Sequence, residues 1–267
     1  MALDDRHCID PISSLDLLRA ERTTLAALRG ADLTAAVDSC PAWSLYDLLS
    51  HLAMVHRMAM RMLATPPTAE APPASERPPE ADDGDAIWNF LDDGMARLLA
   101  EFETRDLTAP CRAFVGPVTI AWWLRRQLHE TTVHRWDAQA ACGQVGSIDP
   151  TVAADGVDEW LDLQVGRGWP ATDGVVGTIH LHATDLTAEE AENGDGEWFI
   201  ELGDTLAWRH GHQKGDVALR GSRSDLLLAS WGRRPVSSLD TVGDVALFER
   251  FLESLKFRPP SSGARPG

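Results

Sequence analysis

The chain has 267 residues, enough for one large domain or two smaller ones. Its 41 acidic against 24 basic residues give a formal net charge of −17, which argues against nucleic acid or an anionic membrane surface as a main partner. The hydrophobic content of 44% is sufficient for a core, and no apolar run reaches the length of a membrane span. The polar, acidic segment at residues 1–10 is unlike a signal peptide.

The four cysteines are scattered along the chain and form no CxxC pair: Cys8, Cys40, Cys111 and Cys142. This pattern is typical of reduced cysteines, so the expected location is cytoplasmic. Cys142 ends a predicted helix, and we expect it to be a core cysteine rather than a nucleophile.

The first half of the chain has the apolar periodicity of helices, expected at residues 12–29, 44–63, 86–104 and 118–142. Ser44, with Asp47 three positions later, predicts a capping box at the start of the second helix, and Gly116-Pro117 is expected to open the fourth. Residues 65–85 are rich in Pro, Ala and acids, which predicts a long flexible connection. Four helices with one long crossover indicate a four-helix bundle.

The pattern changes after Asp149-Pro150. One more helix is expected at 151–165, followed by strands at 178–184, 197–202 and 216–220 and by helices at 222–231 and 243–255. The sequence therefore predicts an α+β chain of two domains, a helical bundle at 1–148 and a small α+β domain at 149–257. Residues 258–267 are expected to form a disordered tail.

The strongest helical run carries Glu130 and His134, which lie four residues apart and so share one helix face. At about 100° per residue from Ile120, they fall near about 280° and about 320°, in a sector that points toward a packed interior. His129 and Trp136 are predicted to point roughly the other way. A buried carboxylate beside a buried imidazole is costly unless it is paired or metal-bound, which makes Glu130 and His134 functional candidates.

Two further histidines, His51 and His56, lie on the apolar face of the second predicted helix or at its flank. Two histidines and one carboxylate leave coordination positions open for water or substrate, as in catalytic metal sites. Periodicity does not choose between His51 and His56. A buried ion pair or a polar core contact is the structural alternative for Glu130 and His134.

Other histidines offer competing sets. His180 and His182 lie two apart on one face of a predicted strand, which is also ligand geometry. His210 and His212 fall in a predicted polar turn. Since neither set has an acidic partner at a clear spacing, we expect these side chains to face solvent.

Four arginines cluster around the predicted helix at 222–231: Arg220, Arg223, Arg233 and Arg234. They indicate either a solvated surface or a clamp for an anionic group such as a carboxylate. The sequence contains no GxSxG, P-loop or GxGxxG motif.

The segments PAWSLYDLLSHLA at 41–53 and LHETTVHRWDA at 128–138 resemble the mycothiol-dependent maleylpyruvate isomerase family, one of the DinB-like metal-binding bundles. GTIHLHATD at 177–185, the pair Glu197-Trp198 and RGSRSDLLLASWGR at 220–233 resemble the smaller C-terminal domain of that family. The resemblance covers about residues 12–255.

The resemblance implies a divalent metal ion, zinc first, held by His51, Glu130 and His134, although such ligands also accept iron or nickel. It thus selects His51 over His56. It also implies mycothiol as co-substrate, a small electrophile as substrate, and an arginine in the C-terminal domain, for which Arg220 is our choice as catalytic residue. We expect a monomer or small homo-oligomer.

The function expected from the resemblance is addition of a metal-activated thiolate to an electrophile, in cis–trans isomerisation or in S-transfer. The alternatives are a non-catalytic metal- or small-molecule-binding protein and a metal-dependent hydrolase.

Overall fold

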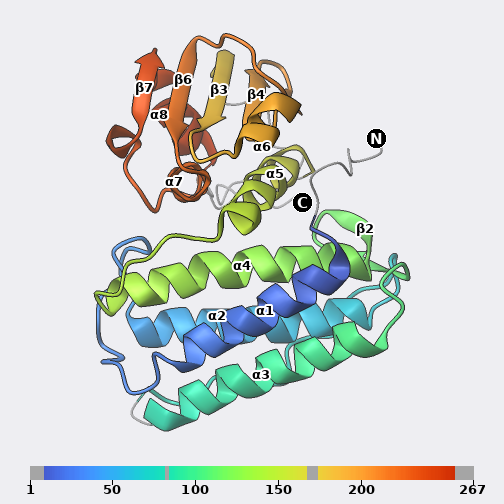
Figure 1. Cartoon of the computed structure of the whole chain (residues 1–267). Helices are drawn as coiled ribbons and strands as arrows, with labels where there is room; N and C mark the ends of the chain where they lie inside the picture. Colours follow the sequence, from blue (N-terminus) through green and yellow to red (C-terminus); the bar gives the residue numbers. More distant parts are fainter. Residues whose placement is uncertain (1–8, 82–83, 167–173, 256–267) are drawn as a thin grey trace, which may run out of the picture. The chain divides into compact units, whose positions relative to one another are not determined.

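The computed structural model describes residues 9–81, 84–166 and 174–255. Residue contacts divide the chain into two compact units, 1–159 and 160–267. The first is helical and the second contains a mixed sheet, so the predicted α+β two-domain class is confirmed (Figure 1). The predicted boundary at 148–149 precedes helix α5 (Pro150–Gly166), whose first ten residues group with the helical unit. The tail predicted at 258–267 lies outside the described residues, as does Cys8.

Four long helices form the first unit: α1 (Pro11–Ala26), α2 (Leu45–Leu63), α3 (Gly84–Thr104) and α4 (Ile120–Ala141). α1 packs on α3 and α4, and α2 packs on the same two helices, which gives the predicted bundle (Figure 1). Leucines from α1, α2 and α3 fill its core with Trp123 of α4. None of the helices in the described ranges has the length and apolar character needed to cross a membrane.

The start of α2 agrees with the sequence prediction, whereas the start of α4 does not. At α2 the predicted capping box is confirmed, because the Ser44 hydroxyl accepts from the Asp47 amide and the Asp47 carboxylate accepts from the Ser44 amide. Before α4 a hairpin of β1 (Pro110–Ala113) and β2 (Gly116–Thr119) was not predicted. Gly116 has a φ of 111°, which glycine adopts readily, and Thr119 caps α4, so the helix begins two residues later than expected.

Helix α4 is buried on all sides rather than on one face. His129 and Trp136, which were predicted to point outward, are only 1% and 6% exposed. The reason is that side chains of this face form hydrogen bonds and ion pairs with Asp155 and Glu159 in the first part of α5. The Trp136 indole N–H donates to the Gly146 carbonyl in the connection between the two helices, at 2.9 Å.

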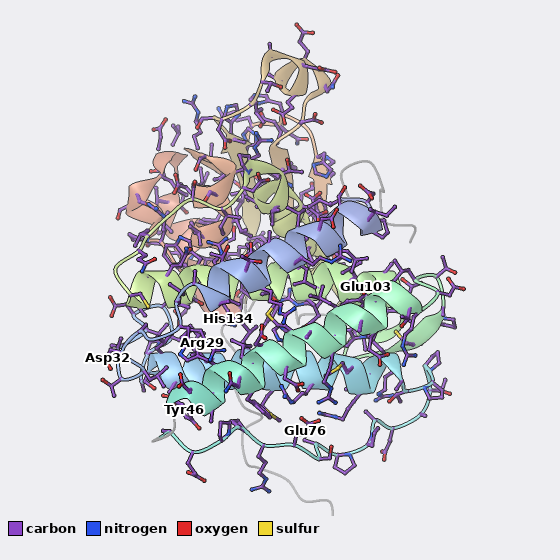
Figure 2. All side chains as sticks on the ribbon, turned by 60° about the horizontal axis from the view of Figure 1, so that its bottom comes forward. Arg29, Asp32, Tyr46, Glu76, Glu103 and His134 are labelled. Carbon is purple, nitrogen blue, oxygen red and sulfur yellow. The ribbon has the colours of Figure 1, made fainter. Side chains whose placement is uncertain are left out.

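The connection between α2 and α3 has no helix or strand over its described residues, as predicted, but it is fixed at several points. Glu76 accepts from Arg57 of α2 at 2.7 Å and from Arg97 of α3, and the Tyr46 hydroxyl donates to the Pro79 carbonyl. Figure 2 shows this connection running along the bundle, with Glu76 on its course. The expectation of a flexible segment is therefore wrong for these residues.

The second unit is a five-stranded sheet in the order β5-β4-β3-β6-β7. Its strands are β3 (Gly177–Ala183), β4 (Glu197–Leu202), β5 (Leu206–His210), β6 (Val217–Gly221) and β7 (Asp240–Gly243). β3 and β6 pair in parallel and the other neighbours are antiparallel. The helices are α6 (Ala188–Asn193), α7 (Arg223–Ser230) and α8 (Val245–Leu255), with a short 3-10 turn at Val236–Ser238. Strands β5 and β7 and helix α6 were not predicted.

A buried ion-pair cluster links α4 to the start of α5. Asp155 is 1% exposed, lies 2.6 Å from His129 Nε2 and accepts from Arg125 Nε at 3.0 Å. Burial acts to raise the pKa of Asp155, but the hydrogen bonds and charges of His129 and Arg125 outweigh it and lower the pKa from 3.8 to about 2.

Replacing Asp155 with asparagine is expected to lower the free energy of unfolding at pH 7 by about 2–3 kcal/mol, at about 1.4 kcal/mol per pKa unit. Since the folded pKa is depressed, this stabilisation is complete above about pH 4 and is lost as the pH falls toward the folded value. The free energies of unfolding of wild type and Asp155→Asn, measured by urea denaturation, should therefore converge at acidic pH. Glu103→Gln, at the exposed pair with Arg19, is the control and should change little. A pH-independent difference for Asp155→Asn would contradict the assignment.

Candidate metal centre

Three side chains from α2 and α4 converge inside the helical unit. His51 Nε2 and His134 Nε2 each lie 3.3 Å from the same oxygen, Oε1 of Glu130. The two imidazole rings are 5.1 Å apart and nearly perpendicular, so their edges converge. The His134 side chain is 10% exposed and that of Glu130 18%, whereas that of His51 is 37% exposed, which leaves the group open to solvent on the His51 side.

A second carboxylate, that of Asp137, contacts His134 on the ring edge opposite Glu130. His134 Nδ1 donates to Oδ2 of Asp137 at 2.9 Å, and the Ser39 hydroxyl donates to Oδ1 of Asp137 at 2.6 Å. Asp137 is fully buried. Because a carboxylate only accepts, this bond places a ring hydrogen of His134 on Nδ1 and directs Nε2 at Glu130, where it can bind a metal ion when it carries no proton.

The other oxygen of Glu130 is occupied by an arginine. Oε2 of Glu130 accepts from Arg126, one helical turn earlier, and Arg126 also donates to the buried Glu159. Burial acts to raise the pKa of Glu130, but the Arg126 charge and the hydrogen bonds with His134 and His51 outweigh it, so the pKa lies well below the usual range. Burial acts to lower the pKa of His134, yet its bonds to Asp137 and Glu130 raise it. The carboxylate is thus ionised, with only Oε1 directed at the histidines.

The loop before α2 carries further neighbours of these side chains. Its backbone is closed by hydrogen bonds between Val37 and Trp43 and between Cys40 and Val37. The Trp43 ring packs 5.0 Å from the ring of His51, and Ser39 contacts Asp137 as above. Cys40 lies within ligand distance of His134 and Asp137 and forms a second possible ligand group with them.

The two groups lie at opposite edges of the His134 ring, because Nε2 faces Glu130 and Nδ1 faces Asp137. Asp137 already accepts from Ser39 and His134. The geometry therefore favours Asp137 as the residue that orients His134, and the group of His51, Glu130 and His134 as the candidate ligand group.

His56, the alternative that periodicity left open, lies apart from this group of ligand atoms. Its Nε2 lies 3.1 Å from the Thr131 hydroxyl, and its Nδ1 has no hydrogen-bond partner. Burial lowers the pKa of His56 to about 3, so the ring is neutral. The structure brings His51 and not His56 together with Glu130 and His134.

Both halves of the chain match family models. Residues 15–139 match the model described as mycothiol maleylpyruvate isomerase N-terminal domain, and residues 151–250 match the model of the corresponding C-terminal domain. The chain belongs to the mycothiol maleylpyruvate isomerase family. The resemblance found in the sequence is thereby confirmed.

Solved structures show the same fold at low identity. A crystal structure of the mycothiol-dependent maleylpyruvate isomerase superposes with a TM-score of 0.60 at 15% identity, covering 89% of this chain and 95% of that one. A histidine-to-alanine mutant of a mycothiol-dependent maleylpyruvate isomerase gives a TM-score of 0.59 with the same identity and coverage. No protein of curated function matches the sequence significantly. At this identity the likeness establishes the fold and leaves the reaction of this family member to be determined.

Sequence reasoning missed the groups that support the ligands in this family member. Arg126 lies four residues before Glu130, and Asp137 lies three residues after His134, so both spacings were readable on the predicted helix. Glu159, Ser39 and Trp43 come from other segments, and no spacing in the sequence connects them to α4.

The second unit places the other predicted histidines differently. His180 is 5% exposed, so its predicted solvent-facing position is wrong, because Glu197 of the neighbouring strand supplies the acidic partner that the local sequence lacked. His182 is half-buried, and His212 is exposed as predicted. His210 belongs to strand β5 and not to a turn.

The four arginines do not form a shared anion clamp within their unit, because each is engaged by a group of its own. Arg220 on β6 is half-exposed and pairs with Asp240 of β7 at 3.2 Å, so its catalytic role stays a prediction. The partners of the others are Glu190 and Asp185 for Arg223, the Trp231 carbonyl for Arg233 and Asp225 for Arg234. Cys142 is a half-buried free thiol at the end of α4 that packs against the core, and burial raises its pKa, which disfavours the thiolate.

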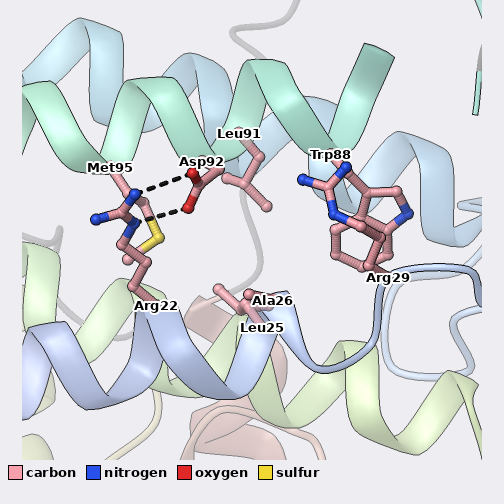
Figure 3. A pocket seen from close by; sticks show the side chains of 8 residues that line it. All are labelled: Arg22, Leu25, Ala26, Arg29, Trp88, Leu91, Asp92 and Met95. Atoms are coloured by element: carbon pink, nitrogen blue, oxygen red, sulfur yellow. Dashed lines mark hydrogen bonds and ion pairs between the residues drawn. The ribbon is translucent and has the colours of Figure 1, made fainter. Parts of the chain in front are cut away.

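A pocket between α1 and α3 contains none of the candidate ligands (Figure 3). Arg22 and Asp92 form a two-bonded ion pair across it, at 2.7 and 2.9 Å. The pocket is lined by Arg22, Leu25, Ala26, Arg29, Trp88, Leu91, Asp92 and Met95. Arg22 and Asp92 satisfy each other and Arg29 donates to Asn89, so we assign this pocket no role.

Replacing Asp137 with asparagine is expected to weaken metal binding by about 10–100-fold, because the partner that orients a ligating histidine typically contributes this much. The measurement is a competition titration of zinc against a chromogenic chelator. Ser39→Ala, which removes only one hydrogen bond to Asp137, is the matched control and should have a smaller effect. Equal affinity of Asp137→Asn and wild type would show that Asp137 does not orient a ligand.

Proposed function

We propose that this protein is a metal- and thiol-dependent enzyme in which His51, Glu130 and His134 hold a divalent ion, zinc first, and a low-molecular-weight thiol attacks a small electrophile. The observation that carries the proposal is the convergence of two imidazole nitrogens on one carboxylate oxygen in a chain of this family. The family name further suggests mycothiol as the thiol.

The residues fit such an ion in their chemistry and in their charge. In the neutral ring whose Nδ1 donates to Asp137, the Nε2 lone pair faces an ionised carboxylate oxygen, so a cation must lie between the two acceptors. A proton on Nε2 fills this place when no metal is bound, as the raised pKa of His134 indicates, and a divalent metal ion can replace that proton. The three carboxylates and one guanidinium of the network carry a net charge of −2 when the histidines are neutral, which balances a divalent cation. Three protein ligands also leave a position open for a further ligand.

The chain's own residues hold this arrangement in place. Arg126 occupies Oε2 of Glu130 and so directs Oε1 toward the histidines. Asp137 fixes the tautomer and orientation of His134, and the Trp43 ring packs against His51 on the more exposed side. Arg126 and Asp137 thus fix Glu130 and His134 on the buried side, and the site is open to solvent at His51. This arrangement suits a centre that must admit both a thiol and a substrate.

A divalent ion at this site would lower the pKa of a bound thiol, so that thiolate is present at neutral pH. Addition of the thiolate to an activated cis double bond, rotation and loss of the thiol would give isomerisation, whereas displacement of a leaving group would give S-transfer. In either reaction Arg220 is our proposed cationic contact for a substrate carboxylate.

The test is turnover of maleylpyruvate or of a model aromatic halide by the full chain, with and without mycothiol and with and without a chelator. Turnover should require both the thiol and the metal. Product formation from water alone would indicate a hydrolase, and metal binding without turnover would indicate a binding protein. Either outcome would overturn the proposal.

A further inference from the structure

A second cluster of possible metal ligands lies in the sheet of the C-terminal unit. It consists of His180 and His182 of β3, Glu197 of β4 and His212 after β5. His180 Nε2 contacts Oε2 of Glu197, His182 Nδ1 lies 2.6 Å from Oε1, and His212 Nδ1 lies 3.3 Å from the same Oε1. All four residues offer a ligand atom within 4.8 Å of one another.

The sheet sets the positions of three of these side chains. His180 and His182 are two residues apart on β3 and therefore share one face. Glu197 pairs directly with His182 in the antiparallel register of β3 and β4, so its carboxylate lies on the same face.

The fourth side chain is brought back by the turn after β5. The Gly211 amide donates to the Glu197 carbonyl at 3.0 Å, which ties this turn to the residue at the centre of the cluster. Gly211 has a φ of 120°, a conformation that glycine adopts readily and other residues rarely do. The next residue, His212, then reaches Glu197 from the β5 side.

The geometry is that of ligands around a common point. The three imidazole planes are nearly perpendicular to one another, at 79°, 90° and 83°, with ring centres 4.9–6.3 Å apart. A tetrahedral zinc ion with bonds of about 2.0–2.1 Å separates its ligand atoms by about 3.3 Å, which equals the distance from His212 Nδ1 to Glu197 Oε1 and lies inside the 4.8 Å that encloses all four ligand atoms. The shorter contacts of Glu197 with His180 and His182 are hydrogen bonds of the metal-free cluster.

The cluster is buried at one end and exposed at the other. His180 is 5% exposed, and its ring is held against Glu197. His212, by contrast, is 74% exposed, which gives an ion a path into the cluster.

We infer that His180, His182, Glu197 and His212 form a second site for a first-row divalent transition-metal ion, such as zinc, in the C-terminal unit. An ion bound there joins β3, β4 and the turn after β5. The imidazole-rich ligand set favours zinc, iron, nickel or copper over calcium or magnesium. This inference does not depend on the proposed function, because it shares no residue with the centre in the helical unit.

The test measures zinc per chain in the full-length protein, after loading and desalting, in a His51→Ala/His134→Ala background that removes the proposed first site. This background should retain about one zinc ion per chain. Adding His182→Ala and His212→Ala to this variant should reduce its zinc content to the level of the buffer blank. Adding His210→Ala instead should leave it unchanged, because His210 pairs with Trp198 and so faces the other side of the sheet.

Two outcomes would overturn the inference. One is that the folded His51→Ala/His134→Ala variant binds no zinc, and the other is that zinc remains bound after His182 and His212 are replaced. Should the background variant fail to fold, the same comparison is made in the wild type, where the His182 and His212 changes should remove one zinc equivalent. His212→Asn alone, at an exposed side chain, should weaken zinc binding by about 10–100-fold or more. This range is the typical loss when a residue that only supports a ligand is replaced, and loss of a ligand should cost no less. The metal-free melting temperature of this variant should equal that of the wild type, and unchanged zinc affinity would also contradict the site.

Discussion

Replacing His134 with alanine is expected to lower thiol-dependent turnover by about 10³-fold or more. A bound divalent ion typically contributes several kcal/mol to transition-state stabilisation, and each 1.36 kcal/mol is about tenfold in rate. His134 provides one of the three converging ligand atoms and is the one held by a buried carboxylate. Steady-state kinetics with saturating thiol, together with the metal content of the purified variant, measure the effect.

His56→Asn is the matched control for this prediction. His56 is a buried histidine on α2 whose ring contacts Thr131 and belongs to none of the ligand groups found among the described residues. The control should retain metal and most of the turnover if it folds. Retained metal and turnover in His134→Ala, or an equal loss of metal in a folded His56→Asn, would contradict the ligand assignment.

Replacing Arg126 with methionine is expected to destabilise the helical unit by about 3–5 kcal/mol, the range found when one partner of a buried ion pair is removed. Arg126 is 7% exposed, and it is the cation between Glu130 and the buried Glu159. Burial acts to lower its pKa, but the charges of the two carboxylates raise it, so the guanidinium is charged throughout. The measurement is urea unfolding followed by the helical signal.

Two comparisons separate this effect from lost packing. Arg126→Met leaves the carboxylates of Glu130 and Glu159 without their cation, whereas the double variant Arg126→Met/Glu159→Met leaves only that of Glu130. The double variant should therefore recover part of the lost stability. Arg19→Met removes an exposed arginine and should cause little change. A loss for Arg126→Met as small as that for Arg19→Met would show that the buried network does not stabilise the bundle.

Helix α4 shows which features the sequence determines. Its periodicity placed Glu130 and His134 on one inward face, and the structure has both beside His51. Its other face was predicted to point away from this interior, because an amphipathic pattern is read against a single packing partner. The polar residues on that face, such as His129, are buried by ion pairs with α5 that no local pattern reveals.

The second cluster shows the limit of local spacing more clearly. The sequence showed His180 and His182 on one strand face, but Glu197 and His212 lie 15 and 30 residues beyond His182. Their proximity depends on the register of β3 with β4 and on the turn at Gly211, since β5 was not predicted. Without the register, an acidic partner could not be assigned, and the histidines were expected to face solvent.

The choice between His51 and His56 came from family resemblance, because both lie on the inner side of α2. The structure separates them by their partners, since His51 reaches Glu130 whereas His56 reaches Thr131. We therefore propose His51, and not His56, as the ligand that α2 supplies to the metal ion.

The most direct measurement is the absorption spectrum of the cobalt-loaded full chain during titration with mycothiol, with His182 and His212 replaced by alanine so that cobalt reports only the helical unit. The account predicts a saturable sulfur-to-cobalt charge-transfer band that is absent when His134 is also replaced. Cobalt that binds at His51, Glu130 and His134 while its spectrum stays unchanged by the thiol would contradict a thiol-activating centre.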